Sequence, residues 1–279
     1  MLDYNKVINI IKNHNFNKTN LTVSHIIPDN QTYPLCFIDG GNSEIISSPK
    51  LSLQAIKIVA IILKENKINK IIIKKELVLI KANNSGYEIE IINKQKFNIV
   101  LCKNIHEVGN IIRNALELKM YTQMQGIFNG LIIKDGGFEA FTELERKEIN
   151  GLNTFCGLSK TSKNKDNSLF NSISGCWYLE KEKYYITKLN SHSSYSFKLE
   201  LKNLEINRVI QKLISNSKDY IYPGYPYGLM LVDRLARVSN QEILNLKVYL
   251  ETKLGKDWEK IKFLENSINA HQLLDNLVF

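Results

Sequence analysis

The sequence predicts an α/β domain in which strands come first and helices accumulate toward the C-terminus. Short apolar runs bounded by turn residues dominate residues 35–101, a pattern typical of strands. Apolar positions then recur every three or four residues over 105–128, which indicates one helix of about six turns. Because no repeat array or low-complexity linker divides the chain, we expect a single domain over residues 1–279, with a helical extension at 1–30 and a core from about 31 to 279.

The remaining elements follow from the same periodicities and from the turn residues between them. Expected strands cover residues 35–38, 45–47, 53–63, 70–81, 87–92, 97–101, 131–137 (a strand and its turn), 155–159, 176–179, 184–188 and 195–201. Residues 83–86 (NNSG) are expected to form a hairpin turn. Expected helices cover residues 4–13, 105–128, 141–149, 205–215, 228–238, 241–254 and 270–277.

Composition bounds the class of protein. Hydrophobic residues make up 44% of the 279 positions, which excludes wholesale disorder. The net charge of +9 favours an anionic partner, either nucleic acid or an acidic membrane. Because lysine, isoleucine and asparagine are abundant throughout, as in proteins from A/T-rich genomes, we discount roughly half of this basic excess.

Several classes of protein are not expected. The four cysteines, Cys36, Cys102, Cys156 and Cys176, form no CxxC pair and are expected to be small buried residues in a reducing cytosol, without zinc. The most apolar stretch, residues 56–63, is too short to span a membrane, and lysines interrupt the first 20 residues, so no signal peptide is expected. The expected location is therefore the cytoplasm, with no membrane partner.

Two apolar strands are followed by the same three residues. Asp39-Gly40-Gly41 and Asp135-Gly136-Gly137 lie 96 residues apart. If the two strands are parallel neighbours, their carboxylates meet at one edge of the sheet, where α/β proteins bind ligands. Two adjacent carboxylates repel unless a cation lies between them, so the pair suits Mg²⁺ or Mn²⁺. The alternative is that each Asp-Gly-Gly is only a turn.

Two further acids are candidates for the same site. Glu117 lies at the border of the apolar stripe of the long helix, and its alternative is a solvated residue paired with Arg113. Asp233 follows the rigid Tyr225-Pro226 turn and lies among apolar residues on the next helix. Its alternative is a surface ion pair with Arg237.

These blocks, in this order, resemble the NurA family of archaeal and bacterial nucleases. The matching segments are FIDGGNS at 37–43, RNALE at 113–117, LIIKDGG at 131–137, GLSKTS at 157–162, a strand pair at 184–201, GYPYGLMLVDRLA at 224–236 and AHQLLD at 270–275. The resemblance spans nearly the whole chain from about residue 35. It departs from the family where both turns read Gly-Gly, since the family often has Gly-Ser.

The resemblance implies an RNase H-like mixed sheet flanked by helices, with extra β-hairpins and a helical C-terminal part. It further implies a Mn²⁺- or Mg²⁺-dependent deoxyribonuclease with two ions per site, a homodimer, and a HerA-type hexameric ATPase as partner in DNA-end resection. The implied action is 5′-to-3′ exonucleolytic and single-strand endonucleolytic, on single strands and duplex ends.

The resemblance implies a role for individual residues of this chain, matched to the family position by position. The residues that match metal-binding carboxylates are Asp39, Glu117 and Asp135, with Asp233 where the family has a late acid or histidine. Lys160 matches a basic residue that would neutralise phosphate charge, and Tyr225 matches an active-site aromatic. From the residues alone, Lys160 reads equally as a solvated lysine, and Tyr225 as turn packing. His271 is the alternative to Asp233 as the fourth ligand. Asp233 is favoured because its eight-residue spacing from Tyr225 matches the family and hard metals prefer carboxylates.

Two other functions compete with a nuclease. Actin-like sugar kinases and ATPases also begin with a strand-Asp-Gly turn that is echoed later in the chain. They need glycine-rich adenosine-binding loops, and the sequence from Asp135 to Phe279 has none. A non-catalytic DNA-binding or ATPase-docking subunit with the same fold is the other alternative, and retention of all four acidic positions argues against it.

Overall fold

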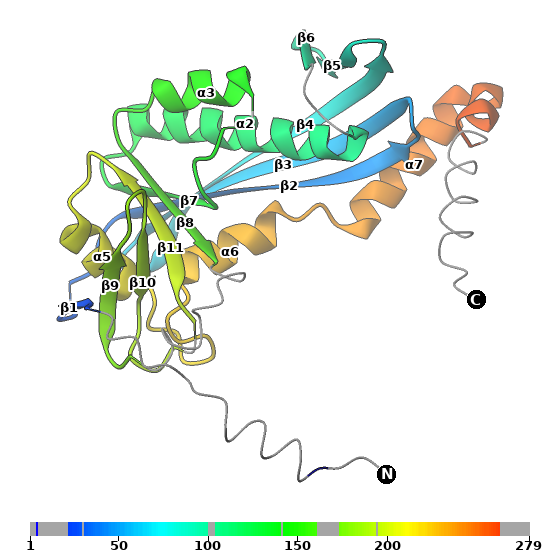
Figure 1. The fold of residues 1–279 in the computed structure, drawn as a ribbon. Helices are drawn as coiled ribbons and strands as arrows, with labels where there is room; N and C mark the ends of the chain where they lie inside the picture. The colour runs from blue at the N-terminus through cyan, green and yellow to red at the C-terminus, as the bar shows by residue number, and fades with distance from the viewer. Residues whose placement is uncertain are drawn as a thin grey trace.

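The computed structural model describes residue 4 and residues 22–29, 31–99, 104–140, 142–160, 173–193 and 195–262 (Figure 1). The expected helices at 4–13 and 270–277 fall outside this range except for Tyr4, as do most of the N-terminal extension, Cys102 and His271. Of the extension, residues 22–29 are described, and they contain a short strand that the sequence did not predict, β1 (Ser24–Ile26).

Eleven strands in the described part of the chain form one mixed sheet, in the order β1-β9-β10-β11-β8-β7-β2-β3-β4-β5-β6. Their bounds are β2 (Leu35–Ser47), β3 (Leu51–Lys64), β4 (Lys67–Asn83), β5 (Gly86–Ile91), β6 (Gln95–Ile99), β7 (Leu131–Asp135), β8 (Phe155–Lys160), β9 (Cys176–Glu180), β10 (Tyr185–Lys188) and β11 (Phe197–Lys202). Strands β2, β7 and β8 run parallel, and every other pairing is antiparallel. The mixed α/β fold and the hairpin turn at Asn84-Ser85 are confirmed.

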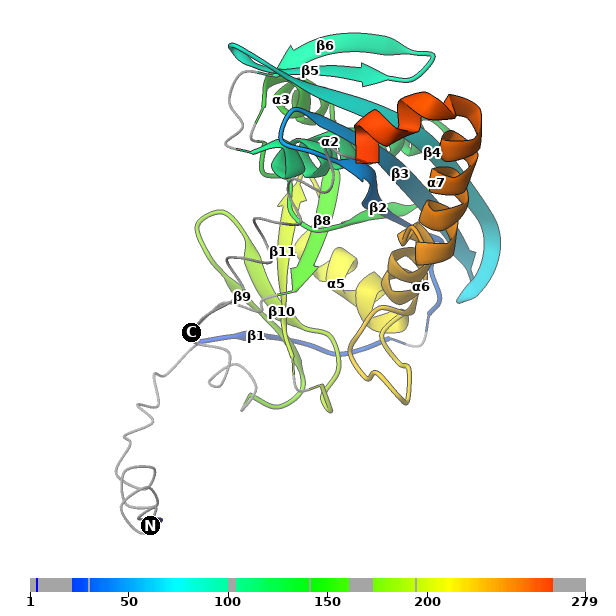
Figure 2. The same ribbon diagram turned by 90° about the vertical axis from the view of Figure 1, so that its right-hand side faces the viewer.

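Helices cover both faces of the sheet (Figures 1 and 2). One face carries α2 (Ile105–Ile127) and α3 (Glu143–Asn150), and the other carries α5 (Ile206–Ser215), α6 (Tyr227–Ala236) and α7 (Asn240–Leu254). Each helix of the first face begins at a side-chain cap, since Asn104 accepts a hydrogen bond from the backbone of Glu107 and Thr142 forms a capping box with Glu145. The predicted long helix is thus confirmed nearly to the residue.

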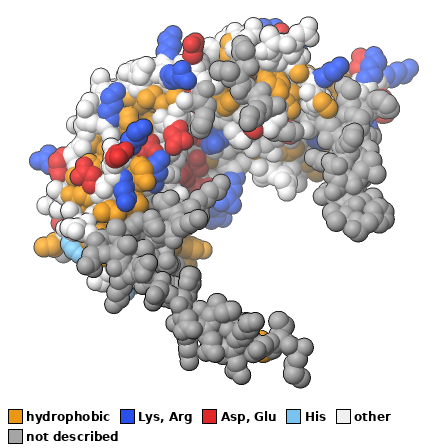
Figure 3. Space-filling model, in the orientation of Figure 1, with side chains coloured by type: hydrophobic (Ala, Val, Ile, Leu, Met, Phe, Trp, Pro, Cys, Tyr) orange, Lys and Arg blue, Asp and Glu red, His pale blue; other side chains and the backbone are white. Residues whose placement is uncertain are grey.

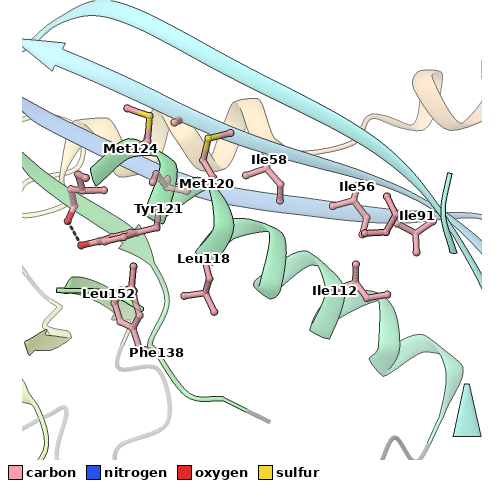
Figure 4. Packing of buried hydrophobic residues seen from close by; sticks show 14 of the residues in the cluster. Ile56, Ile58, Ile91, Ile112, Leu118, Met120, Tyr121, Met124, Phe138 and Leu152 are labelled. Atoms are coloured by element: carbon pink, nitrogen blue, oxygen red, sulfur yellow. Dashed lines mark hydrogen bonds between the residues drawn. The ribbon is translucent and has the colours of Figure 1, made fainter. Parts of the chain in front are cut away.

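The α2 face of the sheet is an apolar core (Figure 4). Ile112, Leu118, Met120 and Met124 of α2 are buried in the same cluster as Ile56 and Ile58 of β3. Two hydrogen bonds of one side chain fix the position of α2 along its axis. The buried Tyr121 hydroxyl donates to the carbonyl oxygen of Ile132 at 3.0 Å and accepts from the backbone N–H of Cys156 at 2.9 Å. This contact ties α2 to both β7 and β8 and so fixes the height of Glu117 over the sheet.

The opposite core positions α6. Leu229 and Val232 of α6 pack in a cluster with Phe37 of β2 and Ile133 of β7. The helix lies very close to the sheet because Gly228 has no side chain. A Cβ atom there would lie 2.1 Å from Cδ2 of the Phe37 ring. Asn216 accepts a hydrogen bond from the Gly228 N–H at 2.9 Å, which fixes the start of the helix that carries Asp233.

The expected parallel pairing of the two Asp-Gly-Gly strands is confirmed, with Ile38 opposite Lys134. The expectation that Asp39-Gly40-Gly41 is a tight turn is wrong. Strand β2 continues through it to Ser47, because β3 supplies hydrogen-bonding partners along its whole length. Neither of these glycines has a positive φ. They are instead sites of close approach: a Cβ at Gly41 would lie 2.3 Å from the carbonyl oxygen of Ala236 in α6.

Three further expectations concern residues 45–47, the cysteines and membrane-spanning helices. Residues 45–47 are the end of β2 rather than a separate strand. Cys36, Cys156 and Cys176 are buried free thiols, as expected. Among the helices that the structure describes, none combines the length and the apolar character needed to cross a membrane.

The close approach at Gly41 gives a test of the fold. We expect Gly41→Ala to lower the free energy of unfolding by about 1–3 kcal/mol, the usual cost of overpacking, because the added methyl group meets backbone that cannot rotate away. The matched control is Gly126→Ala in α2, where a Cβ meets no atom within 4 Å and alanine is the better helix former. Urea unfolding measures both, and equal stability of Gly41→Ala and the wild type would contradict the packing of α6 on β2.

Candidate metal and phosphate site

Three carboxylates from three different elements meet at the point where β2 and β7 separate. Asp39 lies within β2, Asp135 ends β7, and Asp233 lies in α6. One carboxylate oxygen of each of the three residues lies within 4.8 Å of those of the other two. Side chains alternate across a strand, so Asp39 and Asp135 share the face of Phe37 and Ile133, against which α6 packs. The structure thus brings together three of the four predicted acids.

Burial and mutual repulsion make these carboxylates hard to ionise. Burial, followed by the charges of Asp135 and Glu117, raises the pKa of Asp39 from its ordinary value to about 7, although the Gly40 N–H donates to its Oδ1 at 2.8 Å. Burial also raises the pKa of Asp135 to about 6, against the lowering effects of Lys160 and Lys134. A cation between these groups would relieve both the repulsion and the loss of hydration.

Cations already lie at the rim of the cluster. Arg237 donates to Asp233 Oδ2 at 2.6 Å, so the surface ion pair considered from the sequence exists alongside the place of Asp233 in the cluster. Lys160, at the end of β8, lies with its Nζ 5.2 Å from the centre of the half-buried Tyr225 ring. A hydrogen bond to Tyr225, with the charges of Asp135 and Asp233, raises the pKa of Lys160. Both residues named from the resemblance therefore border the acids.

Glu117 lies on the other face of the sheet, below Gly40. It is fully buried, so the solvated alternative is wrong, while its pairing with Arg113 is confirmed. Arg113 also donates to the Gly40 carbonyl oxygen at 3.1 Å. The second Glu117 oxygen, Oε2, lies 2.8 Å from Nζ of the buried Lys134 but without hydrogen-bond geometry, and no other residue of the described part donates to it. The charge of Glu117 still reaches Asp39 and Asp135 and raises the pKa of both.

Sequence reasoning missed the role of Lys134. Its Nζ donates to the carbonyl oxygens of Asp135 at 3.0 Å and Gly137 at 3.4 Å, and so holds the turn after β7. The signal was present in the sequence, because Lys134 is a lone charge inside an apolar strand. A buried lysine requires a carboxylate partner, and Glu117 is the acid on the adjacent helix.

An open cavity of about 840 Å³ extends from the carboxylate cluster along the first half of α2. Its lining combines acids, cations and amides: Asp39, Gly40, Glu107, Asn110, Ile111, Arg113, Asn114, Lys134, Asp135, Gly136, Gly137, Glu139, Thr142, Glu145, Ser159, Lys198 and Asp233. On the face seen in Figure 3, acidic and basic side chains lie side by side rather than in one basic patch.

The donor set suits a hard divalent cation. Carboxylate oxygens from separate elements are the ligands that Mg²⁺ and Mn²⁺ prefer. The buried side chain of Glu117 lies next to the same strand segment, since a Cβ at Gly40 would lie 2.7 Å from its Oε1, and its Oε2 accepts no hydrogen bond from the described residues. These two observations fit a metal centre built on Asp39, Asp135 and Asp233. His271, the sequence-based alternative to Asp233, lies outside the described residues.

The raised pKa values predict how stability depends on pH in the metal-free protein. An aspartate in the unfolded chain titrates near 3.9, so between about pH 4 and pH 7 the folded state binds more protons than the unfolded state. The contribution of Asp39 and Asp135 to the free energy of unfolding therefore falls as pH rises through this range. In EDTA, we expect Asp39→Asn to be more stable than the wild type at about pH 7.5, and to lose this advantage at about pH 5.

Titrating groups that are not coupled to Asp39 cancel when the variant is compared with the wild type at each pH. Asp257→Asn is the matched control, because Asp257 is exposed and remote from the cluster, and it is expected to show no such pH-dependent difference. Urea unfolding at the two pH values gives the result. An Asp39→Asn protein that is less stable than the wild type at both pH values would show that the carboxylate is not under electrostatic strain.

Comparison with known proteins gives two kinds of result. No family model matches the sequence. Among curated proteins, Protein Ycf2 of Physcomitrium patens is 27% identical over 251 residues, which cover 87% of this chain and 10% of Ycf2. The chain thus spans about a tenth of the length of that protein.

Solved structures are more informative about the fold. The NurA nuclease from Sulfolobus solfataricus matches with a TM-score of 0.61 and 14% sequence identity, over 91% of this chain and 94% of that one. A structure of NurA with manganese matches with a TM-score of 0.57 and 7% identity, over 89% of this chain and 95% of that one. The chain therefore has the RNase H-like fold of the NurA nucleases, as the sequence resemblance implied.

Proposed function

We propose that this protein is a metal-dependent deoxyribonuclease that hydrolyses phosphodiester bonds at the Asp39–Asp135–Asp233 cluster. The observation that carries the proposal is the meeting of three carboxylates from β2, β7 and α6, with oxygens within 4.8 Å, at the wall of an open cavity. The NurA-like fold supports the same function. An actin-like kinase has no comparable support.

Each residue of the site has a role that follows from its chemistry. Asp39, Asp135 and Asp233 hold the divalent ions, which we propose to be two Mn²⁺ or Mg²⁺. Ions held there would lower the pKa of a coordinated water and would stabilise charge on the departing oxygen. Lys160 is an exposed cation beside these acids and neutralises phosphate charge. Tyr225, next to Lys160, orients the substrate at the rim of the cluster.

We keep Glu117 in the proposal as a further metal ligand. Its Oε2 has no hydrogen bond from the described residues, and its charge is coupled to Asp39 and Asp135. Binding an ion requires Glu117 to exchange its contact with Lys134 for the metal. The ammonium of Lys134 keeps two backbone carbonyl partners when that happens.

The finer features of the proposal rest on the sequence resemblance and are supported by the shared fold. They are 5′-to-3′ exonuclease and single-strand endonuclease action, DNA-end resection for recombinational repair, assembly as a homodimer, and a HerA-type hexameric ATPase as partner. The cytoplasm is the proposed location.

Neutralising the acids one at a time tests the function. We expect Asp39→Asn, Asp135→Asn and Asp233→Asn each to lower the rate of oligonucleotide cleavage in Mn²⁺ by about 1,000-fold, because the metal supplies several kcal/mol of transition-state stabilisation. EDTA is expected to abolish cleavage by the wild type. Binding of DNA in EDTA should persist in all three variants, because each loses a negative charge.

The matched control is again Asp257→Asn, an exposed aspartate paired with Lys260, which is expected to cleave at the wild-type rate. Wild-type rates in Asp39→Asn or Asp135→Asn would refute the site, and DNA binding without cleavage by the wild type would favour the non-catalytic alternative. Loss of activity in His271→Ala together with full activity in Asp233→Asn would make the histidine the fourth ligand.

Glu117→Gln separates the ligand role from a purely structural one. Removing one partner of a buried ion pair destabilises proteins by about 3–5 kcal/mol, so we expect lower stability in either case. A ligand role predicts in addition that Mn²⁺ binds about tenfold more weakly, as measured by isothermal titration calorimetry on the folded variant. Unchanged Mn²⁺ affinity would leave Glu117 as the counterion of Lys134 and Arg113 alone.

A further inference from the structure

Three large apolar side chains stand in a row on the loop between α5 and α6. The exposed fraction is 101% for Tyr220, 77% for Ile221 and 52% for Tyr222. Single exposed apolar residues are ordinary, but a contiguous group of this size marks a contact surface. The loop is therefore a candidate contact surface.

The loop has a defined backbone. Asp219 Oδ1 accepts hydrogen bonds from the N–H groups of Ile221 at 2.8 Å and Tyr222 at 2.9 Å. The carbonyl oxygen of Tyr222 accepts from the Tyr225 N–H at 3.0 Å, and Gly224 completes the turn with a φ of +88°. The loop backbone that carries the two exposed rings is thus fixed, which lowers the entropic cost of binding through them.

The loop lies near a group of aromatic side chains that borders the carboxylate cluster. The centre of the Tyr225 ring lies 6.3 Å from that of Tyr195 and 5.5 Å from that of Phe197. Tyr195 in turn lies near Asp219 and Tyr222: burial, followed by the electrostatic effects of these two residues, raises the pKa of its hydroxyl. Aromatic side chains therefore extend from Lys160 and the carboxylate cluster outward to the loop.

We propose that Tyr220 and Tyr222 stack against the bases of a single-stranded DNA substrate whose backbone reaches the carboxylate cluster. This proposal rests on the proposed function and adds the residues that bind the unpaired bases of its substrate. Every base has a π-face, so stacking on exposed tyrosines binds single strands with little sequence preference. In a duplex these faces are covered by neighbouring bases, so the loop selects unpaired DNA. The exposed Lys218, beside the rings, offers a charge for the phosphates.

Binding without cleavage is the first test. Fluorescence anisotropy in EDTA measures the affinity of the full-length protein for a labelled oligothymidylate of about 16 nucleotides and for a duplex of the same length. We expect Tyr220→Ala and Tyr222→Ala each to weaken single-strand binding about tenfold and to leave duplex binding unchanged. Tyr249→Ala is the matched control, because this tyrosine is 59% exposed on α7 and is expected to have no effect.

Two further measurements separate stacking from other effects. Tyr220→Phe and Tyr222→Phe keep the ring and are expected to bind single strands within about twofold of the wild type. Neither alanine variant removes a charge, so the dependence of affinity on salt should keep its slope, whereas Lys218→Ala should reduce that slope. Photocrosslinking with 5-iododeoxyuridine is expected to attach the strand to Tyr220 or Tyr222.

The proposal is overturned if the alanine variants bind single strands as well as the wild type does, if they weaken duplex binding equally, or if the wild type binds no oligonucleotide. Failure of this proposal can be distinguished from failure of the proposed function. Tyrosine-dependent binding by a protein that cleaves nothing in Mn²⁺ or Mg²⁺ would refute the nuclease and support the loop. Normal cleavage with unaltered single-strand affinity in both alanine variants would refute base stacking by the loop and support the nuclease function.

Discussion

The parallel register between β2 and β7 is the constraint on which the site depends. Leu35 lies opposite Leu131, and the pairing ends at Ile38 and Lys134. The next residue on each strand is an aspartate, and both aspartates lie on the face covered by α6. A slip of one residue would turn every side chain of one strand to the opposite face and separate the two acids. The buried apolar residues on both faces of β2 and β7 exclude that slip.

The same register sorts the charges onto two faces. Asp39 and Asp135 lie on the α6 face, whereas Lys134 lies on the α2 face with Glu117 and Arg113. The two groups are separated by the backbone at Gly40, where a Cβ would lie 2.7 Å from Glu117 Oε1. Glycine is therefore required for α2 to approach the strand so closely. The result is an acidic cluster whose repulsion is only partly offset by Arg237, Lys160 and Lys134. Such a site destabilises the metal-free protein near neutral pH and favours a divalent cation.

The sequence predicted the elements that depend on local periodicity. The helix α2 and the strands around it followed from the spacing of apolar residues. The adjacency of Asp39 and Asp135 followed from the repeated Asp-Gly-Gly. The continuation of β2 did not, because Gly-Gly is compatible both with a turn and with close packing, and only the position of α6 decides between them. One of the two ion-pair partners of Glu117 was predicted. Arg113 follows from its spacing on the helix, but Lys134 comes from a strand whose distance to α2 is set by tertiary packing. The exposure of Tyr220 and Tyr222 was not predicted, since the exposure of a loop side chain depends on the surrounding fold.

The central claim is that Asp39, Asp135 and Asp233 hold a divalent cation. Anomalous diffraction at the manganese edge, from a crystal soaked in Mn²⁺, tests it most directly. We expect an anomalous peak between the three carboxylates, and its disappearance in crystals of Asp135→Asn. Well-ordered crystals with manganese bound elsewhere and no peak at these carboxylates would contradict it.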